Sequence, residues 1–180
     1  MTLNATANPS HAGMSANPAL TAALAITIIA AATLAGAWFF QLVLDIRPCP
    51  LCLEQRYAYY LAVPLGLLVA FAASREAPRP LLLAGLVILL LAALYNAYLG
   101  AYHAGVEWKF WPGPATCGGG GSLSTSAGSL LGDLQNIKVV QCDEAALRVL
   151  GLSFAGWNVL ASLVIMGLTL RAAFVAAARR

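Results

Sequence analysis

The sequence predicts an all-α membrane protein, a bundle of four transmembrane helices with a long periplasmic loop between the third helix and the fourth. The composition supports this fold, because 61% of the 180 residues are hydrophobic and only 9% are charged, whereas soluble domains carry about 25% charged residues. Long uncharged runs alternate with polar segments, and a helix of ~20 apolar residues spans a bilayer. The net charge of +3 comes from scattered basic residues, which form no patch of the kind that binds nucleic acid.

The N-terminal part of the chain predicts a polar tail and then a first spanning helix. Residues 1–18 are rich in Asn, Ala, Ser and Thr and contain no Lys or Arg, so we expect them to be disordered. The uncharged run 20–44 is longer than the ~7–15 apolar residues of a signal peptide, and it predicts an uncleaved helix. The four-helix domain is expected over 19–175, followed by a cytoplasmic tail at 176–180.

The second and third spans are predicted on either side of a short turn. The second span, 57–73, begins with a group of tyrosines, which favour the membrane interface. Pro64 predicts a kink within this span. Residues 74–80 contain two arginines and two prolines and predict a tight polar turn. The third span is predicted at 81–102.

The fourth span, predicted at 149–170, follows the one long connection of the chain, 103–148. This loop starts with three aromatic residues that suit the membrane interface. The glycine run 118–121 predicts a flexible stretch, and we expect a short interfacial helix at 123–134.

The distribution of basic residues predicts the orientation of the bundle. Arg75 and Arg79 lie in the short turn, and the C-terminal tail is also basic, so both segments are expected in the cytoplasm. Four spans then place both termini inside and the loops 45–56 and 103–148 outside. All four cysteines belong to these two loops, and so they share one face in either orientation. In a bacterial inner membrane that face is the periplasm, where disulfides persist.

The first of these loops contains a Cys-x-x-Cys motif at a predicted helix entrance. Pro50 suits the first helical position, which places Cys49 at the N-cap and Cys52 in the first turn. Unpaired backbone N–H groups and the helix dipole stabilise a thiolate there. Arg56 follows Cys52 by four residues and therefore lies on the same helical face. A cation beside a thiolate at the membrane surface indicates a redox site for an anion or an electron-accepting ring.

Less reactive interpretations of these residues stay open. Arg56 could anchor the helix by extending to the lipid headgroups, and Cys49 and Cys52 could be inert thiols or a local disulfide. A structural disulfide between Cys117 and Cys142 would contribute about 3 kcal/mol by restricting the unfolded chain. Against a purely structural role, the glycines directly after Cys117 would keep its sulfur accessible.

Metal and haem sites are not predicted. The second cysteine pair lacks the short spacing of a structural zinc site. Covalent haem would need a His after Cys52, where the chain has Leu53. His103 would ordinarily be an interfacial histidine with no chemical role. Glu107 lies one turn further on if the helix continues, and the two side chains would then flank a polar pocket.

These motifs resemble the disulfide bond formation protein B family, DsbB, the quinone-linked thiol oxidases of the bacterial inner membrane. The resemblance covers most of the chain, from the first span to the fourth. It rests on Phe40-Gln41, Pro48-Cys49-x-Leu51-Cys52-x-x-x-Arg56, His103, Pro114-Ala115-Thr116-Cys117, and Cys142 followed by Gly151-Leu152 and Trp157.

The resemblance implies bound ubiquinone or menaquinone at the outer end of the bundle and a soluble thioredoxin-like oxidant, DsbA-like, as partner. The periplasmic DsbA–DsbB–quinone system is itself the known case of such electron transfer. By position, Cys117 would form the mixed disulfide with the partner, and Cys142 would then attack Cys49. Cys52 would face the quinone as a thiolate. The residues expected around the quinone are Arg56, Gln41, His103 and Glu107.

Two other classes of function compete with a thiol oxidase. A structural membrane protein with two inert extracytoplasmic disulfides would keep its cysteines fully oxidised, whereas a thiol oxidase would show a partly reduced, partner-dependent population after alkylation. A transporter with a cysteine metal site is disfavoured, because the spans contain no acidic or histidine pairs.

Overall fold

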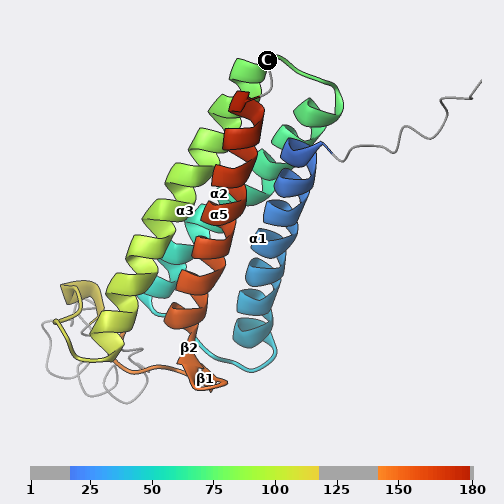
Figure 1. Cartoon of the computed structure of the whole chain (residues 1–180). Coiled ribbons are helices and arrows are strands. Elements are labelled where there is room, and N and C mark those ends of the chain that lie inside the picture. Colours follow the sequence, from blue (N-terminus) through green and yellow to red (C-terminus); the bar gives the residue numbers. More distant parts are fainter. Residues whose placement is uncertain (1–16, 118–141, 179–180) are drawn as a thin grey trace, which may run out of the picture.

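The computed structural model describes residues 17–117 and 142–178 (Figure 1). Its long helices are α1 (Pro18–Leu42), α2 (Pro50–Ser74), α3 (Arg79–Glu107) and α5 (Phe154–Ala178). Each of these four is long and apolar enough to cross a membrane, which confirms the predicted four-helix transmembrane bundle. The predicted tail up to residue 16, the glycine run 118–121 and the expected helix at 123–134 lie outside the described residues.

The helices form a four-cornered bundle in which α1 and α3 occupy opposite corners and each packs against both α2 and α5. The α2–α3 turn lies at one end, here called the turn end, together with the start of α1 and the end of α5 (Figure 1). The N-cap residue Asn17 also donates a hydrogen bond to the carbonyl of Ala73 at the end of α2 (3.0 Å). All four cysteines lie together at the other end, the cysteine end. Their predicted placement on one face is confirmed.

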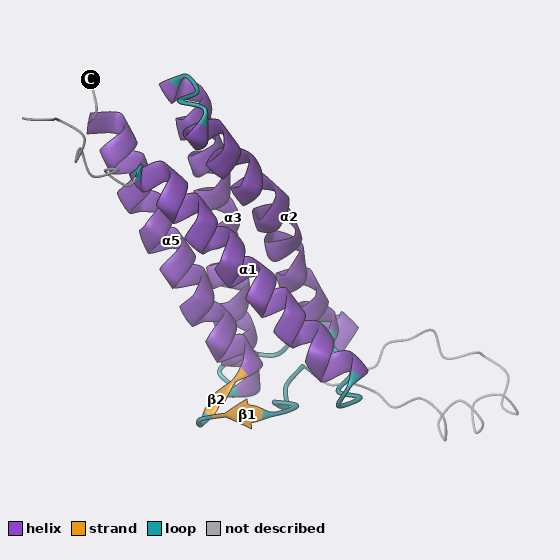
Figure 2. Cartoon of the chain, turned by 90° about the vertical axis from the view of Figure 1, so that its right-hand side faces the viewer, coloured by secondary structure: helices purple, strands orange, loops and turns teal. Residues whose placement is uncertain are grey.

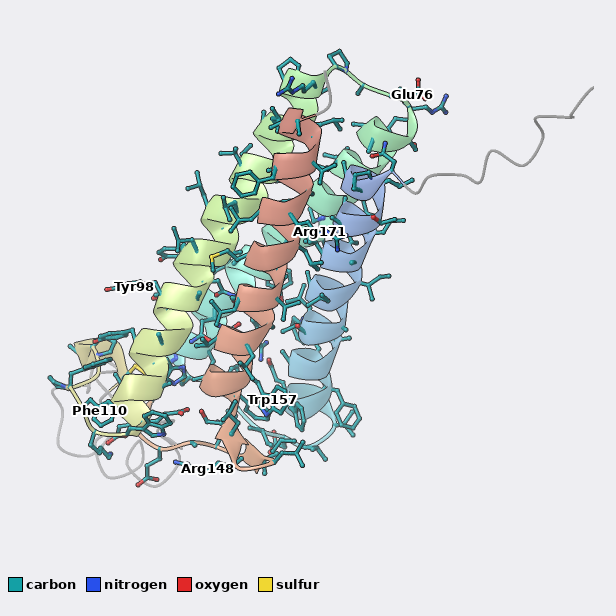
Figure 3. All side chains as sticks on the ribbon, viewed as in Figure 1. Glu76, Tyr98, Phe110, Arg148, Trp157 and Arg171 are labelled. Atoms are coloured by element: carbon teal, nitrogen blue, oxygen red, sulfur yellow. A yellow bond between two sulfur atoms is a disulfide. The ribbon has the colours of Figure 1, made fainter. Side chains whose placement is uncertain are left out.

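Small side chains fill the interior of the bundle, while large apolar ones point outward. The buried core contains many alanines of α1 and α2, with Leu86 and Leu89 of α3 among the larger members. Ile28 and Tyr98, in contrast, are each 66% exposed, and Tyr98 projects away from the bundle (Figure 3). Small residues allow helix backbones to approach closely, and lipid solvates the large outer side chains.

A buried polar network joins α2, α3 and α5. The Tyr59 hydroxyl donates to Asn158 Oδ1 (2.6 Å), and the Asn96 amide donates to Asn158 Oδ1 and to Ser162 Oγ (3.1 Å each). Asn96 and Ser162 are buried. Polar side chains in hydrocarbon find their partners on neighbouring helices, so this network fixes how the three helices are rotated toward one another.

Gly66 is a point of close approach between α2 and α1. A Cβ atom at Gly66 would lie 2.3 Å from Thr27 Oγ1, and that hydroxyl already donates to the carbonyl of Ala23 (2.8 Å). We expect Gly66→Ala to lower the free energy of unfolding by about 1–3 kcal/mol, as overpacked cores do. Thermal unfolding in detergent measures this change as a lower Tm.

Gly167→Ala in α5 is the matched control, because nothing lies within 4 Å of a Cβ atom there. Alanine favours a helix interior over glycine by ~1 kcal/mol, so this variant should unfold at or above the temperature of the original protein. A Gly66→Ala protein that unfolds together with Gly167→Ala would contradict the close contact between the two helices.

The helices begin and end at different residues from those predicted. The prediction took each span from an uncharged run, but a helix continues past the hydrocarbon wherever its backbone groups are paired. α2 begins at Pro50, the first helical position that the sequence predicts, although its apolar span was taken from 57. α3 extends to Glu107 instead of 102, and α5 runs to Ala178 through most of the predicted tail. Pro64 lies inside α2.

A short β-hairpin, absent from the prediction, precedes α5 (Figure 2). Strand β1 (Arg148–Val149) pairs antiparallel with β2 (Leu152–Ser153), and α5 therefore begins at Phe154 instead of 149. Leu150 and Gly151 form the turn with φ values of 54° and 82°. Positive φ at both central residues is typical of two-residue hairpins, and glycine adopts it without strain.

Candidate active site at the cysteine end

Cys49 and Cys52 lie at the N-terminus of α2, in the positions that Pro50 predicts. Cys49 is the N-cap residue, and its sulfur accepts a hydrogen bond from the backbone N–H of Cys52 (3.2 Å). Both are free thiols, with Cys49 buried and Cys52 partly exposed. The unpaired N–H groups and the dipole of α2 therefore favour a thiolate within this pair.

The proton of the reduced pair is held at Cys49. The hydrogen bond with the side chain of Cys52 raises the pKa of the Cys49 thiol, and burial raises that pKa further. A thiol with a raised pKa keeps its proton at neutral pH. A negative charge on the reduced pair is therefore carried by the Cys52 sulfur.

His103 on α3 contacts the cysteine pair directly. Its Nε2 lies 3.7 Å from Cys49 Sγ and 3.8 Å from Glu107 Oε1, and its Nδ1 lies 2.9 Å from the side-chain nitrogen of Gln55. The imidazole is buried among these groups. The predicted proximity of His103 and Glu107 is confirmed, whereas the contact with Cys49 was not anticipated.

Cys117 and Cys142 form a disulfide that packs against the same pair. Cys117 ends the 3-10 helix η1 (Ala115–Cys117). Both cysteines of the disulfide belong to one buried cluster with Cys49, Leu51 and Val106, and Cys52 packs against that cluster. The second pair thus lies beside Cys49 in the interior of the cysteine end.

Contacts from the end of α3 hold the segments around this disulfide. Lys109 pairs with Asp143, the residue after Cys142, at 2.5 Å, and the hydrogen bond from Lys109 lowers the pKa of the Asp143 carboxyl. Trp111 donates from its indole to the carbonyl of Tyr102 (3.0 Å) and stacks on the ring of that tyrosine. Phe110 lies at the same end (Figure 3).

A cavity of about 390 Å³ lies beside Cys52, between α1, α2 and α5. Its size falls within the range of small-molecule sites. The walls are mainly apolar, and the polar groups that line it are Thr33, Arg47, Cys52, Gln55, Arg56, Tyr59, His103 and Asn158. Cys49, Gln41 and Glu107 are not among its lining residues. The cysteine pair therefore has one member toward the cavity and one toward the disulfide.

Arg56 is held in place at the edge of this cavity by α1. Its guanidinium donates to Gln41 Oε1 (2.7 Å) and to the carbonyl of Ala37 (3.4 Å). The same group lies over the ring of Trp38, 5.6 Å from the centroid, as in a cation–π interaction. Gln41 thus reaches the site through Arg56 and not by lining the cavity.

The hairpin and the start of α5 close the outer side of the cavity. Val149, Phe154 and Trp157 line it, and the ring of Phe154 packs 4.7 Å from that of Phe40 on α1. Trp157 donates from its indole to the carbonyl of Val149 (3.0 Å), which fixes β1 on α5. Arg148 and Trp157 lie at this end of the bundle (Figure 3).

Sequence reasoning assigned no role to Gln55, Trp38 or Asn158. It placed Tyr59 in an interfacial aromatic belt, whereas the structure buries this residue, with its hydroxyl on Asn158 Oδ1. Gln55 and Asn158 are polar residues inside spanning helices, which is itself a signal of function or of a buried partner. Trp38 gave no comparable signal, because an aromatic residue near a helix end is ordinary at a membrane interface.

Comparison with known proteins agrees with this geometry. The family model for "Disulfide bond formation protein DsbB" matches residues 19–172. A disulfide bond formation protein B of Polaromonas sp. is 30% identical over 149 residues, covering 81% of this chain and 86% of the relative. Disulfide bond formation protein B 1 of Pseudomonas fluorescens is 29% identical over 147 residues, covering 77% and 80%. An uncharacterized protein of Rickettsia prowazekii is 27% identical over 157 residues, covering 82% and 83%.

The matched region includes the four membrane-spanning helices, except the first residue of α1 and the last residues of α5, together with both cysteine pairs. A match of this extent shows the family, and the family implies thiol oxidase activity. The chain belongs to the disulfide bond formation protein DsbB family of multi-pass membrane proteins.

Proposed function

We propose that this protein re-oxidises a soluble thioredoxin-like oxidant, DsbA-like, through the Cys117–Cys142 disulfide and passes the electrons through Cys49 and Cys52 to a membrane quinone. One observation carries the proposal: both cysteine pairs meet in one buried cluster, and Cys52 alone among the four lines the cavity. Such an arrangement offers a path for two electrons from the Cys117–Cys142 pair to a small molecule within the bundle.

The cavity fits a quinone, either ubiquinone or menaquinone. Its walls are mainly apolar, as a ring with an isoprenoid chain requires, and its polar lining residues include Cys52, Arg56 and His103. Arg56 and His103 could donate hydrogen bonds to the two carbonyl oxygens. A quinone bound here supplies a two-electron, two-proton acceptor. Gln41 orients Arg56, and Glu107 lies beside His103, so both of these act as positioning residues.

The thiol chemistry begins at the outer disulfide. A thiolate of the reduced partner attacks Cys117, which breaks the Cys117–Cys142 bond and forms a mixed disulfide while Cys142 leaves as a thiolate. The second partner thiol then attacks its own bonded sulfur and releases an oxidised partner and Cys117. Each exchange forms one sulfur–sulfur bond and breaks another.

The inner pair re-oxidises the outer one. Cys142 attacks Cys49 of the Cys49–Cys52 disulfide, and Cys52 leaves as a thiolate stabilised by the N-terminus of α2. Cys117 then attacks Cys142, which restores the outer disulfide and releases Cys49, whose raised pKa favours the protonated form. The two electrons and two protons of the inner dithiol are those that the acceptor takes up.

The protein would lie in the bacterial inner membrane, with both termini in the cytoplasm and the cysteine end in the periplasm; the four spans and the family support a multi-pass membrane protein. Arg75 and Arg79 at the turn end agree with this orientation under the positive-inside rule. The partner then reaches Cys117 from the oxidising compartment, where such exchange is useful.

Purified protein, a reduced thioredoxin-like oxidant and a water-soluble quinone test the proposal together. We expect the quinone absorbance to fall in step with loss of partner thiols, one quinone for each two thiols, and only when all three components are present. A protein whose cysteines stay oxidised and whose quinone absorbance stays constant would instead be the structural membrane protein with two inert disulfides.

A further inference from the structure

Cys49, Cys52 and His103 bring a set of metal ligands together at the cysteine end. Their two sulfur atoms and a ring nitrogen all lie within 4.8 Å of one another. Zinc binds thiolate at ~2.3 Å and imidazole at ~2.0 Å, so two such ligands of a tetrahedral ion lie about 3.6 Å apart. The 3.7 Å between Cys49 Sγ and His103 Nε2 agrees with that spacing, and Cys-x-x-Cys is a common zinc-ligand spacing.

The imidazole is held with Nε2 toward the sulfur atoms by Gln55. An amide side chain can present its nitrogen or its oxygen to Nδ1 of His103, 2.9 Å away. With the nitrogen toward Nδ1, the imidazole carries its proton on Nε2. With the oxygen toward Nδ1, the proton lies on Nδ1 and the Nε2 lone pair faces Cys49. The structure has the nitrogen at Nδ1, so metal binding at Nε2 requires the Gln55 amide to turn over and present its oxygen, as partners of metal-bound histidines do.

Glu107 adds a buried carboxylate beside this set. Its side chain is only 4% exposed, and one oxygen lies 3.8 Å from His103 Nε2. The other oxygen, Oε2, makes no hydrogen bond of ordinary geometry with the described residues, although the Ser153 hydroxyl and Arg148 both interact with this carboxyl. Buried carboxylates in proteins are normally paired, and a cation held by Cys49, Cys52 and His103 would give this oxygen an additional partner.

We propose that the reduced Cys49–Cys52 pair and His103 form a binding site for a thiophilic divalent cation, Zn²⁺ or Cd²⁺. The cation enters through the cavity, which Cys52 and His103 line. Binding displaces any proton that remains on the two sulfur atoms and forms two metal–sulfur bonds, with no change of oxidation state. The fourth coordination position is left to water or to Glu107.

The site exists in only one redox state of the protein. Oxidation of Cys49 and Cys52 to a disulfide removes two of the three ligands, so the cation binds the reduced form alone. A bound cation in turn holds both sulfur atoms and keeps Cys52 from giving up its electrons. The cation would therefore inhibit turnover. This inhibition rests on the proposed function, whereas the binding of the cation does not.

Binding is measured on reduced protein carrying Cys117→Ser and Cys142→Ser, which leaves only the inner pair of thiols. Titration with Cd²⁺ should produce a sulfur-to-metal charge-transfer band that saturates at one ion per chain. Competition with a chromophoric chelator gives the affinity for Zn²⁺. Protection of Cys52 from a maleimide by Zn²⁺ in the otherwise unchanged, reduced protein repeats the test without these two substitutions.

His103→Ala should weaken Zn²⁺ binding at least tenfold, and adding Cys49→Ser should abolish the charge-transfer band. His11→Ala is the matched control, since His11 is the other histidine of the chain, and it should leave the affinity unchanged. Circular dichroism checks that every variant keeps its helices. The proposed site is wrong if His103→Ala leaves the Zn²⁺ affinity unchanged. It is also wrong if the reduced protein shows no saturable Cd²⁺ charge-transfer band.

The quinone assay distinguishes a failure of the metal site from a failure of the proposed thiol oxidase function. With chelator present, the quinone assay tests the proposed function alone, and its failure leaves the Cd²⁺ titration interpretable. With Zn²⁺ added, we expect turnover to stop, and chelator to restore it. Full turnover under saturating Zn²⁺ would overturn the inhibition.

Discussion

Replacing Cys142 with serine should convert the protein into a trap for its thioredoxin-like partner. Without Cys142, Cys117 is a free thiol that attacks the disulfide of the oxidised partner and forms a mixed disulfide. No neighbouring thiol of the outer pair can then resolve this bond. We expect a covalent complex on a non-reducing gel and a fall of multiple-turnover quinone reduction to background.

The partner for this experiment is best prepared in two forms. The unchanged partner can resolve the mixed disulfide with its own second cysteine, whereas a partner that lacks this cysteine, activated as a mixed disulfide with a small thiol, cannot. The complex should be partial with the first and nearly complete with the second. Cys117→Ser is the matched control and should form no complex. A complex through Cys142 in that control would reverse the assigned order of the two cysteines.

The surroundings of Cys117 and Cys142 explain why the partner is expected to bond to Cys117. Cys142 is 1% exposed and Cys117 is 5% exposed, so neither sulfur is open to a partner without movement of η1 or of the adjoining chain. Cys117 belongs to a helix of only three residues, and such a short element opens at little cost. Cys142 is instead followed by Asp143, which Lys109 holds. The more easily displaced sulfur is therefore Cys117.

The fold was predictable because its largest energetic term, the transfer of long apolar segments into lipid, can be read from the composition. Uncharged runs long enough to cross hydrocarbon leave little choice other than helices, since every backbone group must be paired within the segment. The helix entrance at Cys49 was predictable for a second reason: proline favours the first helical position, and this local preference needs no tertiary contact. Both predictions depend on residues near one another in the sequence.

The parts that sequence reasoning missed depend on contacts between distant segments. The hairpin before α5 is too short to leave a pattern of alternating residues, and only Gly151 indicates its turn. The role of Gln41 was expected at the quinone, but the structure places this amide on the Arg56 guanidinium. Likewise, His103 approaches Cys49 because α3 packs beside α2, a relation that spacing along the chain does not encode.

Replacing Arg56 with alanine should slow quinone reduction while leaving thiol exchange intact. Arg56 lines the cavity beside Cys52 and would stabilise negative charge on the thiolate and on the reduced ring. Loss of one such group from a preorganised site costs about 10²–10³-fold in rate, so we expect a fall of roughly 10²-fold. Quinone absorbance under steady turnover measures this step, and the formation of oxidised partner in a single turnover without quinone measures the exchange.

Two further variants separate the charge of Arg56 from its orientation. Arg56→Lys keeps the charge but loses the planar, forked donor group, so its rate should fall between those of the original protein and the alanine variant. Gln41→Ala removes the hydrogen bond of 2.7 Å but leaves the contacts with Ala37 and Trp38, and it should cost less than Arg56→Ala. Because Arg56 lines the cavity and does not belong to the cluster that contains the outer disulfide, exchange with the partner should stay within about twofold of normal in all three variants, as expected of independent sites. Equal loss of both steps in Arg56→Ala would instead mean that Arg56 supports the fold of the cysteine end, as a simple interfacial anchor would.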